Sequence, residues 1–473
     1  MEFTFETSAK GEISLNLHRK LGFIEGPLNR FDGLSLVIGY SPVDSAQGKQ
    51  PKALPRRKVI MLMRKAASFA KQNQVKAFQI DFKEIRALAS KDISDADLGQ
   101  LIAEAFVMVS YEPNTYKTPP KDGFIQIETV AVTNASTPAK NGFVKGNMMG
   151  EAVNATRELS NTPGGDMTPE LLAEAAVQAA AGTSAKVKIL GVAEMTQLGM
   201  GAVLGVGKGS ANEPQFIVVE YWGTDRSKKS LVLVGKGVTF DTGGLNVKPG
   251  DHMYEMHMDM SGGAAVIQTV ILAARLGLKK NVIALVPAVE NNLNANAMRP
   301  GDVLKSMSGK TIEVLNTDAE GRVILADAIT YAREYNPMAV VDVATLTGAA
   351  LVALGTVASA YMTNKETLIP SLMELGEDSG DYLWPMPMWE EYDEMTKGTF
   401  GDVPNISTMG NSRYGGVIAG GKFLEVFAKD LDCPWVHIDM APVMTSRPGD
   451  FLAKGAAGAP VRLLLKMVEN GVK

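Results

Sequence analysis

Short apolar runs alternate with helical patterns along the first part of the chain. Runs rich in Val, Ile and Phe predict strands at residues 35–38, 78–80 and 124–132. Between them, the spacing of apolar positions predicts helices at residues 60–70 and 96–109. This alternation is typical of a small α/β domain, which we assign to residues 1–132.

A stretch of small and polar residues separates this pattern from a longer one. Residues 133–142 read TNASTPAKNG, which suits a linker, and the spacing that follows predicts one helix at residues 143–159. The helix is expected to stop within residues 160–165, where Ser, Asn, Thr, Pro and Gly follow one another. We therefore assign residues 133–160 to a linker and helix, and residues 161–473 to a second domain.

The second domain shows the same alternation over a greater length. Short runs that are apolar throughout predict strands covered on both faces at residues 231–234, 282–286, 339–343 and 435–438. One helix between them places its apolar residues on a single face, namely Leu325, Ala328, Ile329 and Ala332. The pattern predicts a larger α/β domain with a mostly parallel central sheet. In such sheets a ligand site lies beyond the carboxyl ends of the strands.

The composition is that of an ordinary globular protein and narrows the range of partners. The chain has 473 residues, 45% of them hydrophobic and 21% charged, with a net charge of −5. This acidic balance argues against a nucleic-acid partner, and the basic residues at 56–58 are interpreted as a solvated turn. Cys433 is the single cysteine, which excludes an intrachain disulfide and fits a reducing compartment. The polar N-terminus and the absence of a long uncharged apolar run predict no signal peptide, no membrane partner and a cytoplasmic location.

Two polar clusters follow predicted strands, where a parallel sheet presents its ligand site. The first begins after residue 234, reads GKGVTFDTGG and continues to KPG, and its glycines let the backbone approach a ligand closely. Its candidate residues are Lys236, Asp241, Lys248 and, shortly after, Asp259. The second cluster reads NTDAEGR at residues 316–322, just ahead of a helix expected to start near Val323. Its candidate residues are Asp318, Glu320 and Arg322.

The carboxylates of these clusters indicate a metal site. Four carboxylates close together repel one another unless cations neutralise them. Oxygen ligands suit Mg, Mn and Zn alike, so these residue types do not select the ion. Each carboxylate taken singly has a structural alternative, such as a helix cap for Asp318 or a first-turn dipole partner for Glu320. The residues alone leave a two-metal site and structural carboxylates as equal alternatives.

Other catalytic patterns are missing from the sequence. The Gly-Lys-Gly after residue 234 lacks the GxxxxGK[ST] spacing of a phosphate loop. Neither the HExxH zinc motif nor the GxSxG motif of serine hydrolases occurs. His437 lies in an apolar run and is interpreted as a core histidine, and His252 and His257 are assigned no ligand role.

Both clusters closely resemble the leucyl aminopeptidase (cytosol aminopeptidase) family. The string NTDAEGR at residues 316–322 is that family's signature. The resemblance extends to RPGDVL, SMSGKT, residues 234–244, ATLTGA at 344–349 and HID at 437–439. It covers most of residues 160–473 and is weak before the predicted linker. Among the few departures, Leu-Asn-Val at 245–247 replaces the commoner Ile-Ser-Leu, which bears on specificity more than on chemistry.

The resemblance implies a role for each matched residue. Lys236 and Asp259 match ligands of one metal, Asp241 and Glu320 match carboxylates that bridge two metals, and Asp318 matches a ligand of the second metal. Lys248 and Arg322 match two catalytic positive charges. Met256, Thr345 and Leu346 are the expected substrate-binding residues. A lysine that binds a metal must be neutral, which adjacent cations permit by lowering its pKa.

The resemblance also implies the reaction and the assembly. The expected activity is release of N-terminal residues, preferably Leu, Met and other apolar ones, from short peptides by a hydroxide that bridges two divalent ions. Zn or Mn are the first choices, with Mg or Co as alternatives. Lys248 would stabilise the oxyanion, and a bicarbonate bound near Arg322 would carry the proton. The family implies a homohexamer, built as a dimer of trimers, with its active sites facing an interior cavity.

Three alternatives stay open at this point. A related metallohydrolase, such as a dipeptidase acting on Cys-Gly, would use the same centre, and a substrate panel separates the two. A DNA-binding role, known for some bacterial members of the family, is opposed by the acidic charge and would appear as a salt-dependent gel shift. A catalytically inactive scaffold is opposed by the intact metal-site and catalytic positions.

Overall fold

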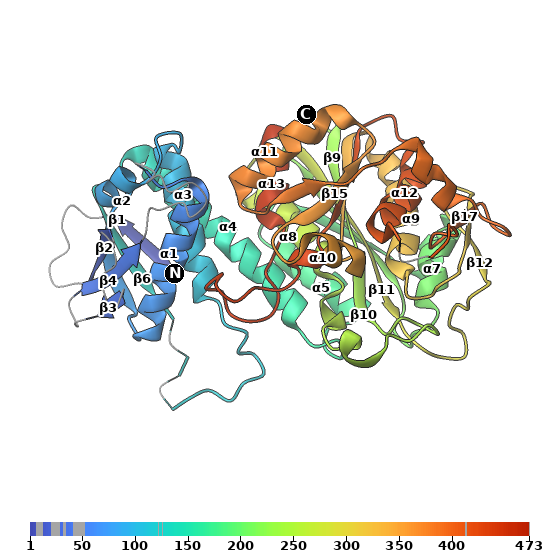
Figure 1. Ribbon diagram of the computed structural model, residues 1–473, viewed down its shortest axis with the longest axis horizontal. Coiled ribbons are helices and arrows are strands. Elements are labelled where there is room, and N and C mark those ends of the chain that lie inside the picture. The colour runs from blue at the N-terminus through green and yellow to red at the C-terminus, as the bar shows by residue number, and fades with distance from the viewer. Residues whose placement is uncertain are drawn as a thin grey trace. The chain divides into compact units, whose positions relative to one another are not determined.

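Contacts divide the chain into two compact units, both of α/β character as the sequence pattern predicts (Figure 1). The computed structural model describes residues 1–5, 13–19, 29–31, 35–40, 53–121, 123–124, 126–411 and 414–472. The smaller unit comprises Met1–Asn154 and Ser446–Gly455, and the larger unit comprises Ala155–Thr445 and Ala456–Lys473. The division lies inside helix α4 (Thr137–Asn161), and the domain boundaries assigned from the sequence stay a prediction.

The smaller unit contains a mostly parallel sheet. Its strands run in the order β1 (Glu2–Phe5), β6 (Thr129–Thr133), β5 (Ala77–Asp81), β2 (Ile13–Arg19), β4 (Ser35–Tyr40) and β3 (Asn29–Phe31). The β3–β4 pair is antiparallel and the other pairs are parallel. The helices are α1 (Arg56–Gln72), α2 (Phe82–Leu88), α3 (Asp95–Ser110) and the first part of α4. One hydrophobic core joins Met63, Phe78, Phe106 and Val130 from these elements. The strand predicted at 124–132 is present only from Thr129 onward.

Helix α4 begins at Thr137, so the stretch predicted to be a linker is already helical there. The small residues of this stretch have two structural roles, helix capping and close helix packing, that the linker prediction did not include. The Ser136 hydroxyl accepts a hydrogen bond from the Ala139 N–H, as a helix cap does. A Cβ on Gly142 would lie 2.0 Å from the Ala96 carbonyl oxygen of α3, and one on Gly146 would lie 2.3 Å from the Gln100 carbonyl oxygen. Glycine therefore lets α4 pack directly on the backbone of α3.

The larger unit is built on a second, mostly parallel sheet. Its strands run in the order β16 (Leu383–Pro385), β15 (Ser359–Thr363), β18 (Trp435–Asp439), β14 (Pro337–Ala344), β9 (Ser230–Gly235), β11 (Asn281–Asn291), β8 (Gln215–Trp222) and β7 (Lys186–Leu190), with β10 (Gly237–Asp241) beside β11. The central strands from β18 to β11 are parallel, and β8 pairs antiparallel with β11. The four strands predicted for this domain are all present.

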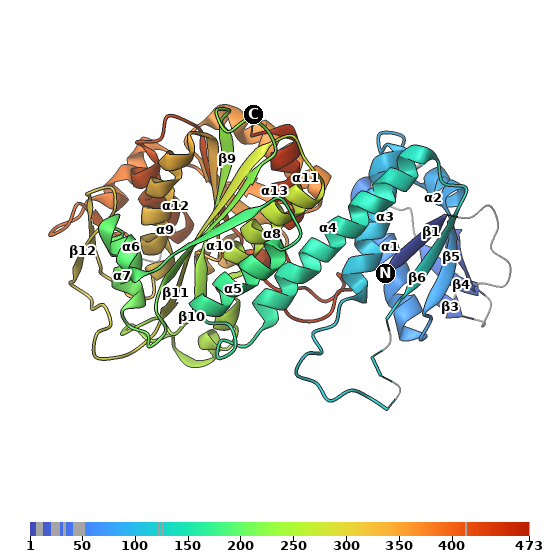
Figure 2. The same cartoon turned by 180° about the vertical axis from the view of Figure 1, so that it is seen from behind.

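Helices cover both faces of this sheet (Figures 1 and 2). On one face α7 (Gly201–Gly207), α9 (Glu320–Tyr331) and α12 (Gly416–Ala428) share a core with strand residues such as Val232, Val234 and Trp435. On the other face lie α5 (Pro169–Ala180), α8 (Ser261–Arg275), α11 (Ile369–Ser379) and α13 (Val461–Asn470). Because both faces are covered, β9 and β11 are buried along their whole length, which explains the apolar runs at residues 231–234 and 282–286.

Shorter elements complete the larger unit. They are α6 (Val192–Gln197), α10 (Gly348–Leu354), a small sheet of β12 (Val303–Lys305), β13 (Thr311–Glu313) and β17 (Val403–Pro404), and the 3-10 turns η1 (Gly250–Met253), η2 (Met256–Met258), η3 (Ala332–Tyr335), η4 (Glu366–Leu368), η5 (Glu390–Thr396) and η6 (Ala441–Val443). In the described part of the chain, no helix is both long and apolar enough to cross a membrane.

Candidate metal centre

The candidate residues meet at the carboxyl edge of the parallel strands. Lys236 directly follows β9, and Asp241 is the last residue of β10. Asp259 lies between η2 and α8, and Glu320 is the first residue of α9, three residues earlier than the predicted start of this helix. Parallel strands present their carboxyl ends at one edge, so loops far apart in sequence converge there.

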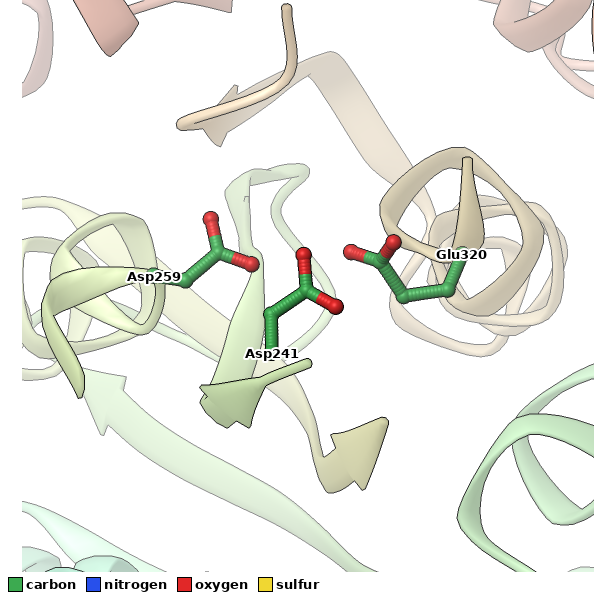
Figure 3. A group of neighbouring side chains, drawn as sticks. All are labelled: Asp241, Asp259 and Glu320. Carbon is green, nitrogen blue, oxygen red and sulfur yellow. The ribbon is translucent and has the colours of Figure 1, made fainter. Parts of the chain in front are cut away.

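Asp241, Asp259 and Glu320 form a buried carboxylate cluster. One carboxylate oxygen of each residue lies within 4.8 Å of one oxygen of each of the other two. The three residues come from three different segments of the chain. Figure 3 shows the carboxylates turned toward one another. Each residue is at most 3% exposed, so water screens their mutual repulsion poorly.

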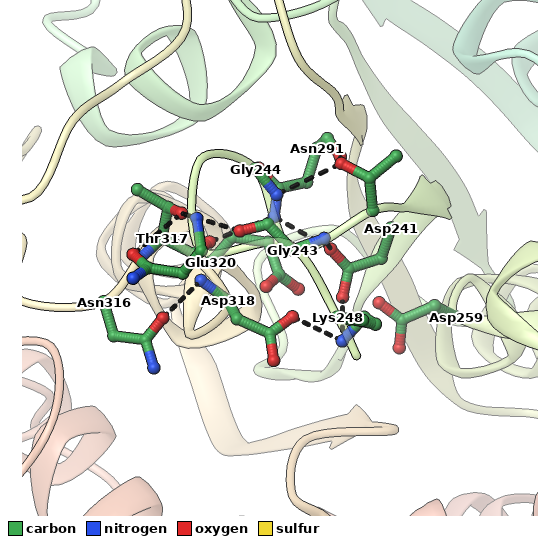
Figure 4. Close-up of polar contacts among 12 residues, drawn as sticks. Asp241, Gly243, Gly244, Lys248, Asp259, Asn291, Asn316, Thr317, Asp318 and Glu320 are labelled. Atoms are coloured by element: carbon green, nitrogen blue, oxygen red, sulfur yellow. Dashed lines mark hydrogen bonds and ion pairs between the residues drawn. The ribbon is translucent and has the colours of Figure 1, made fainter. Parts of the chain in front are cut away.

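Two lysines lie between the carboxylates. Lys236 Nζ is 2.6 Å from Asp259 Oδ2 and 2.8 Å from Glu320 Oε1. Lys248 Nζ is 2.8 Å from Asp241 Oδ2 and 2.5 Å from Asp318 Oδ1 (Figure 4). Each ammonium thus pairs with two carboxylates, which leaves the group with an excess of negative charge.

The pKa shifts reflect this excess. Burial, followed by repulsion from Asp241, raises the pKa of Glu320 to about 8. Burial also raises the pKa of Asp259 to about 6, against the opposing effect of Lys236. Burial lowers the pKa of Lys236, but the surrounding carboxylates outweigh burial and the net shift is upward. The carboxylates are therefore costly to ionise together, and additional cations would stabilise their charged forms.

The donor set fits divalent metal ions. Glu320 Oε2 is buried and has no hydrogen-bond partner among the described residues, which is costly for a carboxylate oxygen without a cation. Oxygen donors from several carboxylates, together with one amine, suit Mn or Zn. A Cβ added at Gly321 would lie 2.6 Å from Lys236 Cε and 2.8 Å from its Nζ, so a larger residue there would displace the Lys236 side chain from its present position.

Neighbouring polar groups orient the carboxylates. Asn291 Nδ2 donates to Asp241 Oδ1 at 2.8 Å and to the Thr317 carbonyl oxygen at 3.0 Å. Thr345 Oγ1 donates to Asp259 Oδ1 at 2.6 Å. The Asp318 N–H donates to Asn316 Oδ1 at 2.9 Å, which shapes the turn before α9 (Figure 4). Sequence reasoning missed Asn291, although it ends β11 at the same edge of the sheet and the strand-end rule alone could have identified it.

The two sequence clusters are joined by a hydrogen-bonded clamp. Thr317 Oγ1 donates to the Gly243 carbonyl oxygen at 2.6 Å and accepts from the Asn246 N–H at 2.8 Å. Asn246 Oδ1 in turn accepts from the Thr317 N–H at 2.9 Å. Asn246 is one of the residues that depart from the common family sequence, and its side chain links the loop after β10 to the loop before α9.

Arg322 lies on α9, two residues after Glu320. Its side chain is buried, and Nε has no hydrogen-bond partner among the described residues. Burial lowers the pKa of Arg322 to about 10, while Glu320 and Asp439 favour its charged form. A guanidinium with an unused buried donor is suited to bind a small anion.

A cavity of about 610 Å³ opens beside the centre. Asp318 and Arg322 form its polar end and Leu346 part of its apolar wall, whose further members are Ala319, Ala349, Val352, Ala353, Met386, Ile406, Val417 and Ile418. Of the expected substrate-binding residues, Leu346 lines this cavity, whereas Met256 and Thr345 do not. Met256 is half-buried on η2, and Thr345 instead contacts Asp259.

The apolar lining was not predicted from the sequence. Met386, Ile406 and Val417 come from three separate segments, each without a local motif. Met386 follows β16, Ile406 follows β17 and Val417 lies on α12, so only the tertiary fold brings the three to one wall.

Comparison with known proteins identifies relatives of this site. The profile of the catalytic domain of the cytosol aminopeptidase family matches residues 154–465. The chain is 39% identical over 437 residues to a probable cytosol aminopeptidase of Roseiflexus castenholzii, covering 88% of both chains. It is 42% identical over 377 residues to a probable cytosol aminopeptidase of Syntrophotalea carbinolica, covering 78% of this chain and 75% of that protein.

A solved structure is similar over nearly the whole chain. The bottromycin maturation enzyme BotP in complex with Mn superposes with a TM-score of 0.83 at 27% sequence identity, covering 98% of this chain and 100% of that chain. A second structure of BotP superposes with a TM-score of 0.80 at 26% identity, covering 97% of this chain and 99% of that chain.

Proposed function

Because the chain belongs to the cytosol aminopeptidase family, whose members are metal-dependent peptidases, we propose that it is a two-metal aminopeptidase acting on short peptides. The observation that carries this proposal is the buried cluster of Asp241, Asp259 and Glu320, whose negative charge two lysines only partly offset.

Five residues are proposed as the metal ligands. Lys236 and Asp259 would bind one ion, Asp241 and Glu320 would bridge, and Asp318 would bind the second ion through its side chain and backbone. Two divalent ions at these positions would polarise the scissile carbonyl and provide a water of lowered pKa. Mn and Zn are the proposed ions, and the Mn in the BotP complex supports Mn. Lys236 would bind as the neutral amine, in contrast to the protonated form that its carboxylate neighbours favour without metal.

Lys248 and Arg322 are proposed as the catalytic cations. Lys248 Nζ lies beside both Asp241 and Asp318, at the side of the cluster that faces the cavity end formed by Asp318. From there its ammonium would stabilise negative charge on the carbonyl oxygen in the transition state. The unused Nε donor of buried Arg322 would bind a bicarbonate ion, which takes up and returns the proton.

The apolar cavity supports a preference for apolar substrates. Its wall of Leu346, Met386, Ile406 and Val417 would gain free energy by burying an aliphatic side chain, by about 25 cal/mol per Å². We propose Leu and Met as preferred N-terminal residues. Leu346 would contact that residue from the cavity wall, and Met256 and Thr345, which lie outside the lining, are proposed substrate-binding residues by relation to the family. The proposed assembly is a homohexamer and the proposed location is the cytoplasm, both by relation to the family.

Hydrolysis of leucine p-nitroanilide by chelated and metal-reconstituted protein tests the proposal. Activity should disappear on chelation and return with Mn or Zn, with Co and Mg tried in parallel. An N-acetylated substrate is the matched control and should not be cleaved, since it lacks the free α-amine that the proposed site requires. Equal cleavage of the blocked substrate, or no activity with any of these ions, would refute the proposal.

A further inference from the structure

The HID motif ends in a buried carboxylate that is neither a proposed metal ligand nor part of the cavity lining. Asp439 is the last residue of β18 and is fully buried. Its Oδ1 accepts from the N–H groups of Leu346 at 3.1 Å, Ala441 at 3.2 Å and Thr347 at 3.4 Å. Its Oδ2 accepts from Thr347 Oγ1 at 2.6 Å. These four bonds use most of the acceptor capacity of one carboxylate.

Most of these bonds go to one turn, which joins β14 to α10. Thr345 within this turn donates to Asp259 Oδ1 at 2.6 Å, and its carbonyl oxygen accepts from Lys236 Nζ at 3.2 Å. Leu346 lines the apolar cavity. Thr347 Oγ1 also accepts from the Ala350 N–H at 3.1 Å and so caps α10. The same short turn therefore contacts the proposed metal ligands through Thr345 and lines the cavity through Leu346.

We propose that Asp439 is a positioning residue for the reaction, which orients the 345–347 turn and through it both the Asp259 carboxylate and the Leu346 wall of the cavity. This inference rests on the proposed function. A carboxylate is suited to this place because acceptors alone are needed there. An amide in its place would keep one oxygen for the three N–H groups but present its N–H₂ group to the Thr347 hydroxyl, which would then accept and lose the acceptor for its own proton, so the turn is expected to shift.

The test compares Asp439→Asn with a matched control, Asp327→Asn. Asp327 is also fully buried and accepts from the N–H groups of Ala202, Val203 and Met307, none of which binds a proposed metal or lines the cavity. Both variants lose a buried acceptor of backbone N–H groups and should melt at lower temperature. Mn affinity is measured by equilibrium dialysis without substrate, and kcat/KM is measured on leucine and alanine p-nitroanilides well below both melting temperatures.

Asp439→Asn should weaken Mn binding by about 10-fold or more, as substitutions of residues that orient metal ligands do. It should also reduce kcat/KM more for leucine p-nitroanilide than for alanine p-nitroanilide. Asp327→Asn should keep wild-type Mn affinity and the wild-type ratio of the two substrates. Wild-type Mn affinity and selectivity in Asp439→Asn would overturn the proposal. The same losses in Asp327→Asn would also overturn it, since they would then follow from lowered stability.

Should Asp439→Asn fail to fold, Thr347 provides a second comparison. Thr347→Val removes the hydroxyl that donates to Asp439 at nearly constant shape, and Thr347→Ser retains it. The valine variant should show the losses and the serine variant should not, and equal behaviour of the two would count against the role of Asp439. A wild-type protein that binds Mn but releases no leucine would refute the proposed function, while the Mn affinities would still decide the role of Asp439.

Discussion

Lys236 and Lys248 show how one site can combine positive and negative groups at close range. Each ammonium lies within 2.8 Å of two carboxylates, and these contacts raise the pKa of both lysines despite their burial. The proposed roles of the two differ, because Lys236 is a ligand and Lys248 a source of positive charge for the substrate. Substitution of individual residues can separate these roles.

Replacement of Lys248 or Arg322 by Ala should impair the chemistry and leave the metals in place. Loss of one preorganised positive group typically lowers kcat by about 100-fold or more. Neither residue is a proposed ligand, so metal content, measured by inductively coupled plasma mass spectrometry, should stay at the wild-type value. Loss of metal in either variant would contradict the assignment of these two residues to catalysis.

Asn291→Ala should weaken metal binding without removing a ligand. Its amide donates to Asp241 and to the loop before α9, so its loss frees the carboxylate of Asp241, a proposed metal ligand, to rotate. Changes of this kind reduce metal affinity by about 10- to 100-fold. Asn294→Ala, an exposed position in the following loop, is the control and should bind Mn as the wild type does. Equal Mn affinities of the two variants would show that Asn291 does not orient Asp241.

The sequence predicts which residues meet in the buried cluster better than it predicts what surrounds them. The residues of the cluster come from two compact motifs, and the strand-end rule places both motifs at one edge of the sheet. Asn291 lies outside both motifs; the end of β11 places it at this edge of the sheet, and its contact with Asp241 shows what it does there. Met256 carries a family expectation but does not line the cavity, so its contact with substrate stays a prediction.

Among the helices, α4 shows most clearly where prediction from the sequence pattern fails, because part of the predicted linker is helical. Residues 133–142 are mostly small and polar. Linkers have this composition, and so do helix starts that pack closely on another helix, so composition does not distinguish the two. The distinction depends on α3, whose backbone carbonyls lie against Gly142 and Gly146. The central strands were easier to predict, because burial on both faces makes the middle of each strand a continuous apolar run.

Gly146→Ala should destabilise the smaller unit through this helix contact. The added Cβ would lie 2.3 Å from the Gln100 carbonyl oxygen, which forces α4 away from α3. Overpacking of this kind costs about 1–3 kcal/mol, more than the helix propensity gained from alanine. Denaturant unfolding measures the effect. Gly165→Ala is the control, since nothing lies within 4 Å of its Cβ, and an equal loss of stability in both would exclude the close contact as the cause.

The complete chain is expected to gain stability from its metals. Ions that bind only the folded state relieve the repulsion within the carboxylate cluster, and at 100 times the dissociation constant they add about 2.7 kcal/mol per site. The melting temperature should therefore rise when Mn is added to chelated protein. An unchanged melting temperature across a Mn titration would contradict binding at the buried cluster.

Assembly is the largest-scale prediction. Sedimentation at micromolar concentration should give the mass of six chains, as the relation to the family implies. Such an assembly would restrict substrates to short peptides, so leucine should be released from a tripeptide and not from a folded protein with an N-terminal leucine. A monomer in sedimentation would contradict both expectations.

Titration of chelated protein with Mn, with the initial rate of leucine p-nitroanilide hydrolysis recorded at each addition, tests the two-metal account most directly. Protein concentration is set well above the dissociation constants, so that each added ion is bound. The account predicts a rate that continues to rise until two ions are present per chain and then stays constant. A rate that reaches its plateau at one ion per chain, or no hydrolysis at any ratio, would contradict it.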